Sequence, residues 1–410
     1  MSKIRILAIP PDAYGVGKFR ITNPYSHLQE HHGDEFHVDI KTNVPDDDRE
    51  FDDYDIIVLH SFIHNTVSFE RNVERVIQLK SQGKIVIVDI DDFWTPDMRH
   101  PMYQHIIKNN VNKQKIALLQ VASYVSTTTS IFRDTIMKKL NIKNVVVFPN
   151  AIDPNESQFI PNPTKSDRIR FGWLGGSSHL YDIELMKEGL SGIHDYGKDK
   201  VQLVLCGFDT RGELTEMNKE TGQVIKRPIK PEETVWSKYE QMFTKNYSVL
   251  LSYYTSYLKM YKETEYDDEN MPYRRRWTKD ITKYAYNYNL FDVSLAPIVD
   301  TTFNNNKSQL KVIEAGFHKK ALIASETNPY LIDLVSAIEF GGKYNPNGNC
   351  LLVPQSKNHK GWFQHMKRLL DNPEMIKDLG EKLYETVKDK YSLNKVNNDR
   401  SEFFKSIVKK

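Results

Sequence analysis

The sequence is poor in cysteine and has no long apolar run. Its 410 residues include two cysteines, Cys206 and Cys350, which are too few for a disulfide framework and favour a reducing compartment. No stretch approaches the roughly 18 apolar residues of a membrane-spanning helix, and the apolar start, Ile4–Ile9, is too short for a signal peptide. We therefore expect a cytoplasmic protein, with peripheral membrane contact left open.

A net charge of one sign is also lacking, because 56 Lys and Arg nearly balance 54 Asp and Glu. No global field attracts nucleic acid, which is disfavoured as a partner but left open because a local basic cluster suffices for phosphate contacts. No Cys and His cluster has metal-ligand spacing, so we expect no metal requirement and no other cofactor. The length exceeds the roughly 250–300 residues that one core usually organises, so two domains are predicted.

Short apolar runs alternate with helix-like stretches in the first part of the chain. The runs are continuous rather than alternating, which is typical of parallel strands buried on both faces. We therefore predict a doubly wound α/β domain over residues 1–160. Its predicted strands are Ile4–Ile9, Phe36–Ile40, Ile56–Leu59, Ile85–Val88, Tyr124–Thr127 and Val145–Phe148.

The same pattern begins again after a polar linker that contains prolines. We predict a second α/β domain over residues 165–388 and a final amphipathic helix over 389–410. An interruption at about 209–290 divides the second domain. The predicted strands here are Ile169–Leu174, Val201–Leu205, Asp292–Ala296 and Ala321–Ala324.

The interruption is unusual in composition. Residues 239–290 contain eleven of the 22 tyrosines, an acidic cluster at 263–269 and the basic run Arg274–Arg276. One interpretation is an amphipathic helical insertion that uses tyrosine for half-buried packing. The other is an aromatic and cationic surface that binds a sugar acceptor or its phosphate, with Arg275 and Arg276 as the acceptor-binding residues.

Chemically versatile residues follow several predicted strands, where open α/β sheets bind their ligands. Gly15 and Gly17 follow the first strand and would let backbone N–H groups approach a ligand. Their spacing is not that of a dinucleotide fingerprint, which argues against a dehydrogenase. His60 ends the third strand, and Asp91 and Asp92 follow the fourth. Such groups act as general bases, orient hydroxyls or coordinate metal, but they also cap helices, and these alternatives stay open.

Four blocks in the middle part of the chain resemble the retaining glycosyltransferases of family 4. They occur in the order and at the spacing of that family, and together they cover about residues 150–330. The first is similar to a P-N-G-v-D signature, the second to the glycine-containing opening of the second domain, and the third to a core that contains K-x-x-E-A. The blocks are Val146–Asp153, Phe171–Asp182, Phe291–Gly316 and Ala324–Tyr330.

The resemblance implies a GT-B fold, in which two Rossmann-like domains face a cleft and a C-terminal helix crosses back to the first domain. In that family the donor lies in the second domain and the acceptor largely against the first. Glu314 matches the second Glu of a Glu-x7-Glu motif that holds the nucleotide ribose, whereas Asn306 stands where the family has the first Glu. Lys307 and Lys311 would contact the diphosphate and neutralise the leaving charge.

We therefore predict a hexosyl- or pentosyltransferase that moves a sugar from a nucleotide-diphosphate sugar to a glycan, lipid-linked or other hydroxyl acceptor, with retention. The alternatives are transfer to modified DNA bases, another GT-B enzyme such as a nucleotide-sugar epimerase, and a non-catalytic nucleotide-sugar-binding protein. The predicted catalytic residues are His60, Asp91, Asp92 and Lys307. The predicted donor-binding residues are Gly15, Gly17, Gly175, Gly176, Ser177, Lys307, Lys311 and Glu314.

Overall fold

A computed structural model describes residues 3–42, 45, 47–60, 68–209, 212–217, 224–244, 269–339 and 342–408. The chain packs into two compact units. Unit 1 comprises residues 1–157, 300–313 and 387–410, and unit 2 comprises 158–299 and 314–386. The segment 300–313 therefore packs with unit 1, although the sequence pattern assigned it to the second domain. None of the helices in the described ranges is long and apolar enough to cross a membrane.

Unit 1 is built on a six-stranded sheet in the order β2-β1-β3-β4-β5-β6, in which every pairing is parallel. Successive residues of one strand pack into two different cores, as Leu7 and Ile6 do, so both faces are buried. This double burial explains the continuous apolar runs and confirms the parallel sheet. The strands are β1 (Ile4–Ile9), β2 (Phe36–Ile40), β3 (Ile56–His60), β4 (Ile85–Ile90), β5 (Tyr124–Thr127) and β6 (Val145–Val147).

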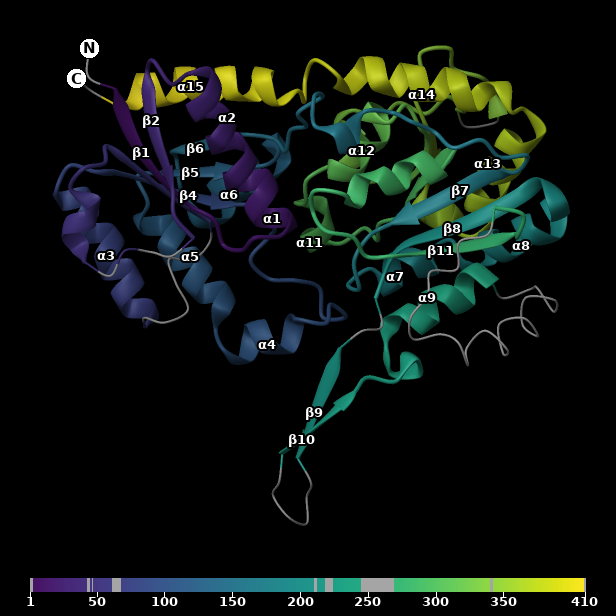
Figure 1. Cartoon of the computed structure of the whole chain (residues 1–410), viewed down its shortest axis with the longest axis horizontal. Helices are drawn as coiled ribbons and strands as arrows, with labels where there is room; N and C mark the ends of the chain where they lie inside the picture. The colour runs from purple at the N-terminus through teal and green to yellow at the C-terminus, as the bar shows by residue number, and fades with distance from the viewer. Residues whose placement is uncertain are drawn as a thin grey trace. The chain divides into compact units, whose positions relative to one another are not determined.

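The helices of unit 1 cover both faces of its sheet (Figure 1). A π-helical turn, Lys18–Thr22, joins α1 to α2 directly after β1. The C-terminal helix α15 packs on α2, where Asn397 Nδ2 donates to Pro24 O at 2.8 Å and Phe404 stacks on Tyr25. The helices are α1 (Gly15–Gly17), α2 (Asn23–His31), α3 (Phe69–Ser81), α4 (Tyr103–Lys108), α5 (Val111–Val121), α6 (Ser130–Leu140), α11 (Thr302–Asn305) and α15 (Leu393–Ile407).

Unit 2 contains a second parallel sheet of six strands, in the order β11-β8-β7-β12-β13-β14. Counted within this sheet alone, the order is 3-2-1-4-5-6, that of the doubly wound dinucleotide-binding fold. The sequence pattern missed its two edge strands. The strands are β7 (Ile169–Leu174), β8 (Val201–Phe208), β11 (Tyr273–Trp277), β12 (Val293–Ala296), β13 (Ala321–Ser325) and β14 (Leu351–Val353).

One core of unit 2 joins this sheet to its helices. Trp173 from the sheet, Leu190 from α8 and Trp362 from α13 all belong to it. A Cβ on Gly189 would lie 2.9 Å from the Trp362 Cβ, so glycine permits the close packing of α8 on α13. The helices are α7 (Leu180–Glu184), α8 (Lys187–Gly197), α9 (Val235–Thr244), α12 (Leu310–Phe317), α13 (Lys360–Asp371) and α14 (Glu374–Val387), and the boundary between the two units falls within α12.

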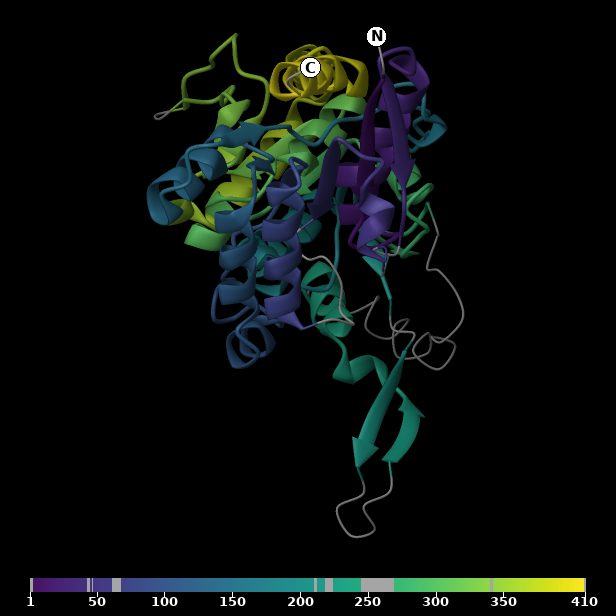
Figure 2. The ribbon, with the colours of Figure 1, turned by 90° about the vertical axis from the view of Figure 1, so that its left-hand side faces the viewer.

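The interruption in unit 2 is not simply a helical insertion. An antiparallel hairpin of β9 (Glu213–Met217) and β10 (Val224–Pro228) follows β8 and stands away from the sheet of its unit (Figures 1 and 2). Helix α9 comes next, and β11 then adds a strand beside β8. Six of the eleven tyrosines and most of the acidic cluster lie outside the described residues. The helical interpretation is thus right for α9 and wrong for the hairpin and β11.

Candidate functional site

The sheet of unit 1 changes its winding direction between β1 and β3. The chain proceeds from β1 to β2 on one side and through β3 to β6 on the other, and the carboxyl ends of strands at such a switch point are where open α/β sheets bind ligands. Gly15 and Gly17 follow β1, and His60 is the last residue of β3. The fold therefore places these predicted residues at the expected edge of the sheet.

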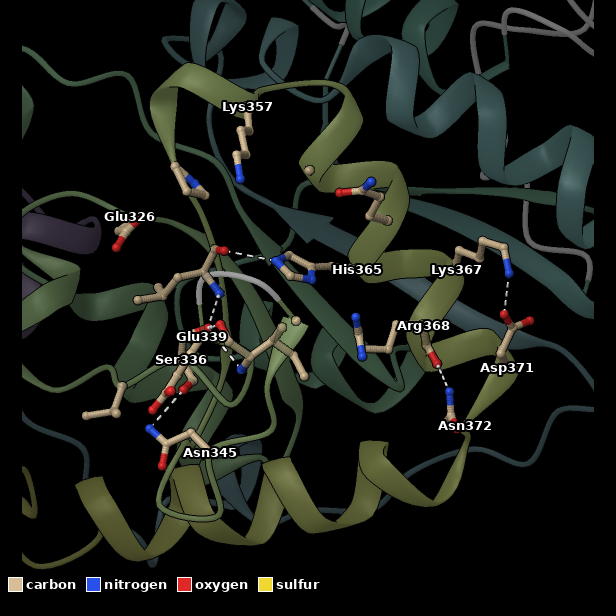
Figure 3. Close-up of a pocket in the computed structure, with 17 residues that line it drawn as sticks. Glu326, Ser336, Glu339, Asn345, Lys357, His365, Lys367, Arg368, Asp371 and Asn372 are labelled. Carbon is tan, nitrogen blue, oxygen red and sulfur yellow. Dashed lines mark hydrogen bonds and ion pairs between the residues drawn. The ribbon is translucent and has the colours of Figure 1, made fainter.

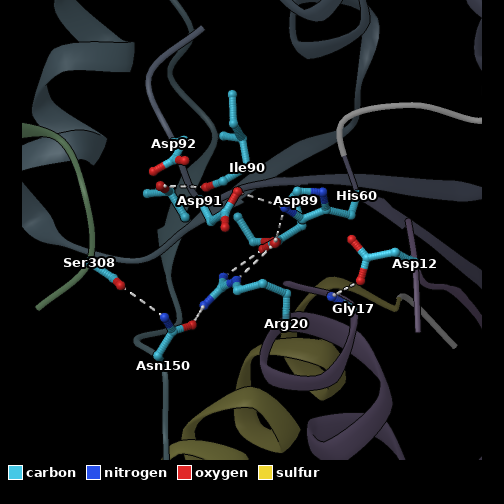
Figure 4. Close-up of polar contacts among 12 residues, drawn as sticks. Asp12, Gly17, Arg20, His60, Asp89, Ile90, Asp91, Asp92, Asn150 and Ser308 are labelled. Atoms are coloured by element: carbon cyan, nitrogen blue, oxygen red, sulfur yellow. Dashed lines mark hydrogen bonds and ion pairs between the residues drawn. The ribbon is translucent and has the colours of Figure 1, made fainter. Parts of the chain in front are cut away.

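A buried ion pair organises this edge (Figure 4). The Arg20 guanidinium donates to both Asp89 oxygens at 2.9 and 2.7 Å, and Ser126 Oγ donates to Asp89 at 2.6 Å. Arg20 and Asp89 are each 3% exposed. Arg20 also donates to Phe148 O at 2.7 Å and to Asn150 Oδ1 at 3.1 Å. Because a buried charge needs both a counter-charge and hydrogen bonds, this network fixes the end of β4 relative to the helix after β1.

His60 lies beside two carboxylates at the same edge. Its Nε2 atom is 3.0 Å from Asp91 Oδ1 and 3.7 Å from Asp89 Oδ2. Burial alone would raise the pKa of Asp91, but the attraction and hydrogen bond of His60, together with the Arg20 charge, hold that pKa below its usual range. Asp91 is therefore an ionised acceptor that orients the imidazole, an arrangement suited to proton transfer or to holding a hydroxyl.

Asp92 and Lys307 form a second pair in unit 1. The Lys307 Nζ atom lies 3.8 Å from Asp92 Oδ1 and 4.7 Å from the centroid of the Phe303 ring. Since Asp91 and Asp92 are consecutive, the structure brings the four predicted catalytic residues into one neighbourhood. Asp92 and Lys307 are far apart in the sequence, so the sequence alone did not predict that they pair.

The glycine loop after β1 uses its backbone donors within unit 1. The N–H groups of Tyr14 and Gly17 donate to Asp12 Oδ1 at 2.8 and 3.0 Å. A Cβ on Gly17 would lie 1.9 Å from Asp12 O, so only glycine permits this turn. The loop thus binds a carboxylate of its own chain, and ligand binding by Gly15 and Gly17 stays a prediction.

Unit 2 has its switch point between β7 and β12. Gly175, Gly176 and Ser177 directly follow β7, and the last two are exposed. Gly207, at the end of β8, has φ +91°, and a Cβ there would lie 2.2 Å from Gly175 O. Glycine at position 207 therefore allows the neighbouring strand ends to approach closely.

A hydrogen-bonded chain fixes the segment after this glycine turn. His179 N donates to the Tyr239 hydroxyl at 2.8 Å, and His179 Nδ1 lies 2.7 Å from Asp182 Oδ2. The other oxygen of Asp182 accepts from Val299 N at 2.8 Å. Asp182 thereby connects the start of α7 to the segment after β12, across the switch point of this sheet. Its role was not predicted, because position 299 is distant in sequence.

Glu314 is buried between two tyrosine hydroxyls. Tyr284 and Tyr288 both donate to its carboxylate, Tyr288 at 2.9 Å, and Glu314 is 4% exposed. Burial and the adjacent carboxylate raise the pKa of Tyr288 well above its ordinary value, so Tyr288 stays a donor. Glu314 is thus held by at least these two hydrogen bonds within unit 2. Its ribose contact, like the diphosphate contact of Lys311, stays a prediction.

The position of Arg275 differs from what an acceptor-binding residue requires. Arg275 is fully buried, its NH1 atom donates to both Glu240 oxygens at 2.9 and 3.1 Å, and its guanidinium lies 4.4 Å from the Phe208 ring centroid. Tyr273 donates to the same carboxylate at 2.8 Å. The guanidinium thus holds β11 and α9 together instead of facing an acceptor. Arg276 is half-buried on the same strand, and its acceptor role stays a prediction.

The described ranges contain no group of three or more His, Cys, Asp or Glu side chains arranged to hold a metal ion. Independence from metal nevertheless stays a prediction. No protein-family model matches the chain, and no curated protein matches it.

Solved structures do match, over almost the whole chain. Sucrose-phosphate synthase from Thermosynechococcus elongatus is 13% identical, with a TM-score of 0.63 and 99% of each chain covered. Anabaena HepE in complex with UDP is 11% identical, with a TM-score of 0.56, and 99% of this chain and 100% of that one are covered. Trehalose-6-phosphate synthase OtsA is 10% identical, with a TM-score of 0.52 and coverage of 87% and 73%.

These likenesses show the fold. The chain has the two-domain GT-B architecture, with one parallel six-stranded sheet in each domain. The predicted fold class is thereby confirmed. At this level of identity the resemblance to family 4 in particular stays a prediction.

Proposed function

We propose that the protein is a glycosyltransferase that transfers a hexose from a nucleotide-diphosphate sugar to a hydroxyl acceptor. The observation that carries this proposal is the coincidence of a GT-B fold with His60, Asp91 and Asp92 at the switch point of the first sheet. A nucleotide donor is supported by the complexes of the similar HepE structure with UDP and with UDP-glucose. Retention and membership of family 4 rest on the sequence blocks alone.

The donor in this proposal binds at the carboxyl ends of β7 and β12. Gly176 and Ser177 are exposed in the turn after β7 and offer their backbone N–H groups to the diphosphate, as turns and helix starts at such positions do, whereas Gly175 N donates to Cys206 O. Glu314 accepts hydrogen bonds from the ribose hydroxyls beside those from its tyrosines. Lys307 and Lys311 belong to unit 1, so the positive charge that they would supply for the departing diphosphate is an expectation from the sequence.

The acceptor in this proposal is held by unit 1. Asp91 fixes the imidazole of His60, and these two groups with Asp92 orient the attacking hydroxyl. The acceptor oxygen forms a bond to the anomeric carbon while the bond from that carbon to the phosphate oxygen breaks. The proton of the attacking hydroxyl is transferred either to His60 or to an oxygen of the departing phosphate.

Glu314→Gln tests the donor site. Loss of a charge-assisted hydrogen bond costs about 1.5–3 kcal/mol, so the affinity for UDP, measured by calorimetry, should fall roughly tenfold to a hundredfold. Glu381→Gln is the control, because Glu381 is an exposed carboxylate paired with Lys319. A UDP affinity equal to that of the unmodified protein would remove Glu314 from the donor site.

His60→Ala tests the reacting centre. Loss of a positioned acid–base group lowers turnover by about 10²–10⁴-fold, whereas His37→Ala, which removes an exposed histidine of the same unit, should have no such effect. Turnover is screened with UDP-, GDP- and dTDP-sugars, with hydroxyl acceptors or DNA, and in EDTA, since we propose no metal requirement. Full activity of His60→Ala would contradict its role. Recovery only with Mn²⁺ would contradict metal independence.

A further inference from the structure

Unit 2 contains a cavity of about 900 Å³ that none of the predicted site residues lines. It lies between the ends of β13 and β14, residues 335–339 and 342–345, and helix α13 (Figure 3). This volume is within the roughly 300–1,000 Å³ range of small-molecule sites. Gly361 is in its wall, where a Cβ would lie 2.8 Å from Val353 Cγ1, so glycine lets α13 approach the end of β14.

One wall of the cavity is basic and comes largely from α13. Arg368 lines the cavity, and in the described part of the chain its Nε atom is buried without a hydrogen-bond partner. The neighbouring Lys367 lines it too, but its charge is paired with Asp371. Lys367 also donates a hydrogen bond to the Tyr196 hydroxyl and lies over the Tyr196 ring. Lys357 contributes a further positive charge from the segment before the helix. The unneutralised guanidinium therefore favours an anionic ligand.

His365 is an uncharged residue of the same wall, one helical turn from Arg368. Its Nε2 atom is 2.9 Å from Leu352 O, so Nε2 carries the ring proton and donates a hydrogen bond to this carbonyl. The Nδ1 atom is then an acceptor, and among the described residues it has no partner. Burial lowers the pKa of His365, which keeps the ring neutral. Because the Nδ1 atom is buried, the ring is a neutral part of the wall rather than a contact for a ligand.

The opposite wall is rich in acceptors. Glu326 follows β13, and Glu339 belongs to residues 335–339; both line the cavity and both are exposed. Ser336 and Asn345 fix that wall, because Ser336 Oγ donates to Ile338 O at 2.8 Å and Asn345 Nδ2 to Ser336 O at 3.3 Å. Carboxylates on this side repel an anion but accept from hydroxyl groups.

We propose that this cavity binds a sugar phosphate, with its phosphate at Arg368 and Lys357 and its hydroxyl groups directed to Glu326 and Glu339. Among the described lining residues there is no Phe, Tyr or Trp on which a nucleotide base would stack. The ligand class follows from this combination of basic side chains on one wall and exposed carboxylates on the other in one cavity. The site is separate from the proposed donor site and does not depend on the proposed reaction.

The test is calorimetric titration with glucose 6-phosphate, and with inorganic phosphate and glucose as separate arms. We expect saturable binding of glucose 6-phosphate, tighter than that of either fragment. Arg368→Gln should weaken it at least about tenfold, as expected for a lost charge-assisted hydrogen bond. Arg368→Lys should retain part of the affinity, and Lys367→Gln, the matched control one residue away, should retain nearly all of it.

Three results would overturn the proposal. They are the absence of saturable binding to the unmodified protein, equal affinity for inorganic phosphate and glucose 6-phosphate, and unchanged affinity in a folded Arg368→Gln. A competition titration with UDP gives a further decision, since displacement of glucose 6-phosphate by UDP would assign the cavity to the donor. UDP affinity is measured on the same variants, so failure of this site is distinguishable from failure of the donor site.

Discussion

At the scale of single residues, the candidate site depends on charges that the protein pairs with one another. Arg20 lies in a π-helical turn, an irregular element often found at functional sites, and Asp89 is on the neighbouring strand end. Their sequence separation is 69 residues, so no local pattern predicts the pair. The sequence did mark His60, Asp91 and Asp92, because they follow predicted strands, but it did not reveal that Asp89 and Arg20 support them.

Arg20→Gln should be strongly destabilising. The substitution leaves the Asp89 carboxylate buried and largely uncompensated, which typically costs about 3–5 kcal/mol. Urea unfolding of the variant and the unmodified protein measures this loss. Lys405→Gln, which breaks exposed pairs with Glu35 and Glu402, should cost about 0–1 kcal/mol. A loss for Arg20→Gln as small as that of the control would show that the buried pair contributes little.

At the scale of elements, sequence patterns were reliable for longer apolar strands and failed for the two edge strands of unit 2, the short β14 and the arginine-rich β11. Predicted strands such as Ile4–Ile9 and Ile169–Leu174 match β1 and β7 exactly in their bounds, since both strands are buried on two faces. Strand β11 was missed because it contains Arg274–Arg276, a run that reads as polar surface. What makes the fully buried Arg275 compatible with a strand is the buried Glu240, which α9 supplies from elsewhere in the chain.

Arg275→Ala should therefore reduce stability rather than acceptor use. Removing its guanidinium leaves Glu240 buried, so we expect a loss of about 3–5 kcal/mol, while turnover per folded molecule stays near its original value. Arg276→Ala on the same strand is the matched control and should destabilise much less, because this side chain is half-buried. Thermal unfolding and acceptor kinetics, measured on both variants, show whether Arg275 contributes to stability or to acceptor use. Unchanged stability with impaired acceptor use would restore the acceptor role of Arg275.

At the scale of the whole molecule, two sheets of different strand order each carry predicted residues at their own switch point. In unit 1 these are the residues after β1, β3 and β4, and in unit 2 the turn after β7. The repetition of the α/β pattern in the sequence was enough to predict two domains. The packing of residues 300–313 with unit 1 was not predictable, because it depends on long-range contacts such as that of Phe303 with the core of that unit.

The stability of the molecule should also decrease in acid because of histidines buried in unit 2. His318 stacks on Tyr288, and burial lowers its pKa from 6.5 to about 3, while burial lowers that of His194 to about 4. Between about pH 6.5 and 3 the unfolded chain binds a proton at position 318 that the folded protein does not. The free energy of unfolding therefore falls as the pH falls through this window, and the contribution is complete above pH 6.5.

His318→Phe isolates this contribution, because phenylalanine keeps an aromatic ring against Tyr288 but binds no proton. Urea unfolding at about pH 7 and pH 4.5 should show that the unmodified protein loses on the order of 2–3 kcal/mol more than the variant over this interval. Between about pH 7 and 8 the difference between the two proteins should stay constant, since a histidine with an ordinary pKa is already neutral there. Parallel acid dependence of the two proteins from pH 7 to 4.5 would show that His318 is protonated as readily in the folded state as in the unfolded one. The acid sensitivity of the molecule would then have to come from its other titrating groups.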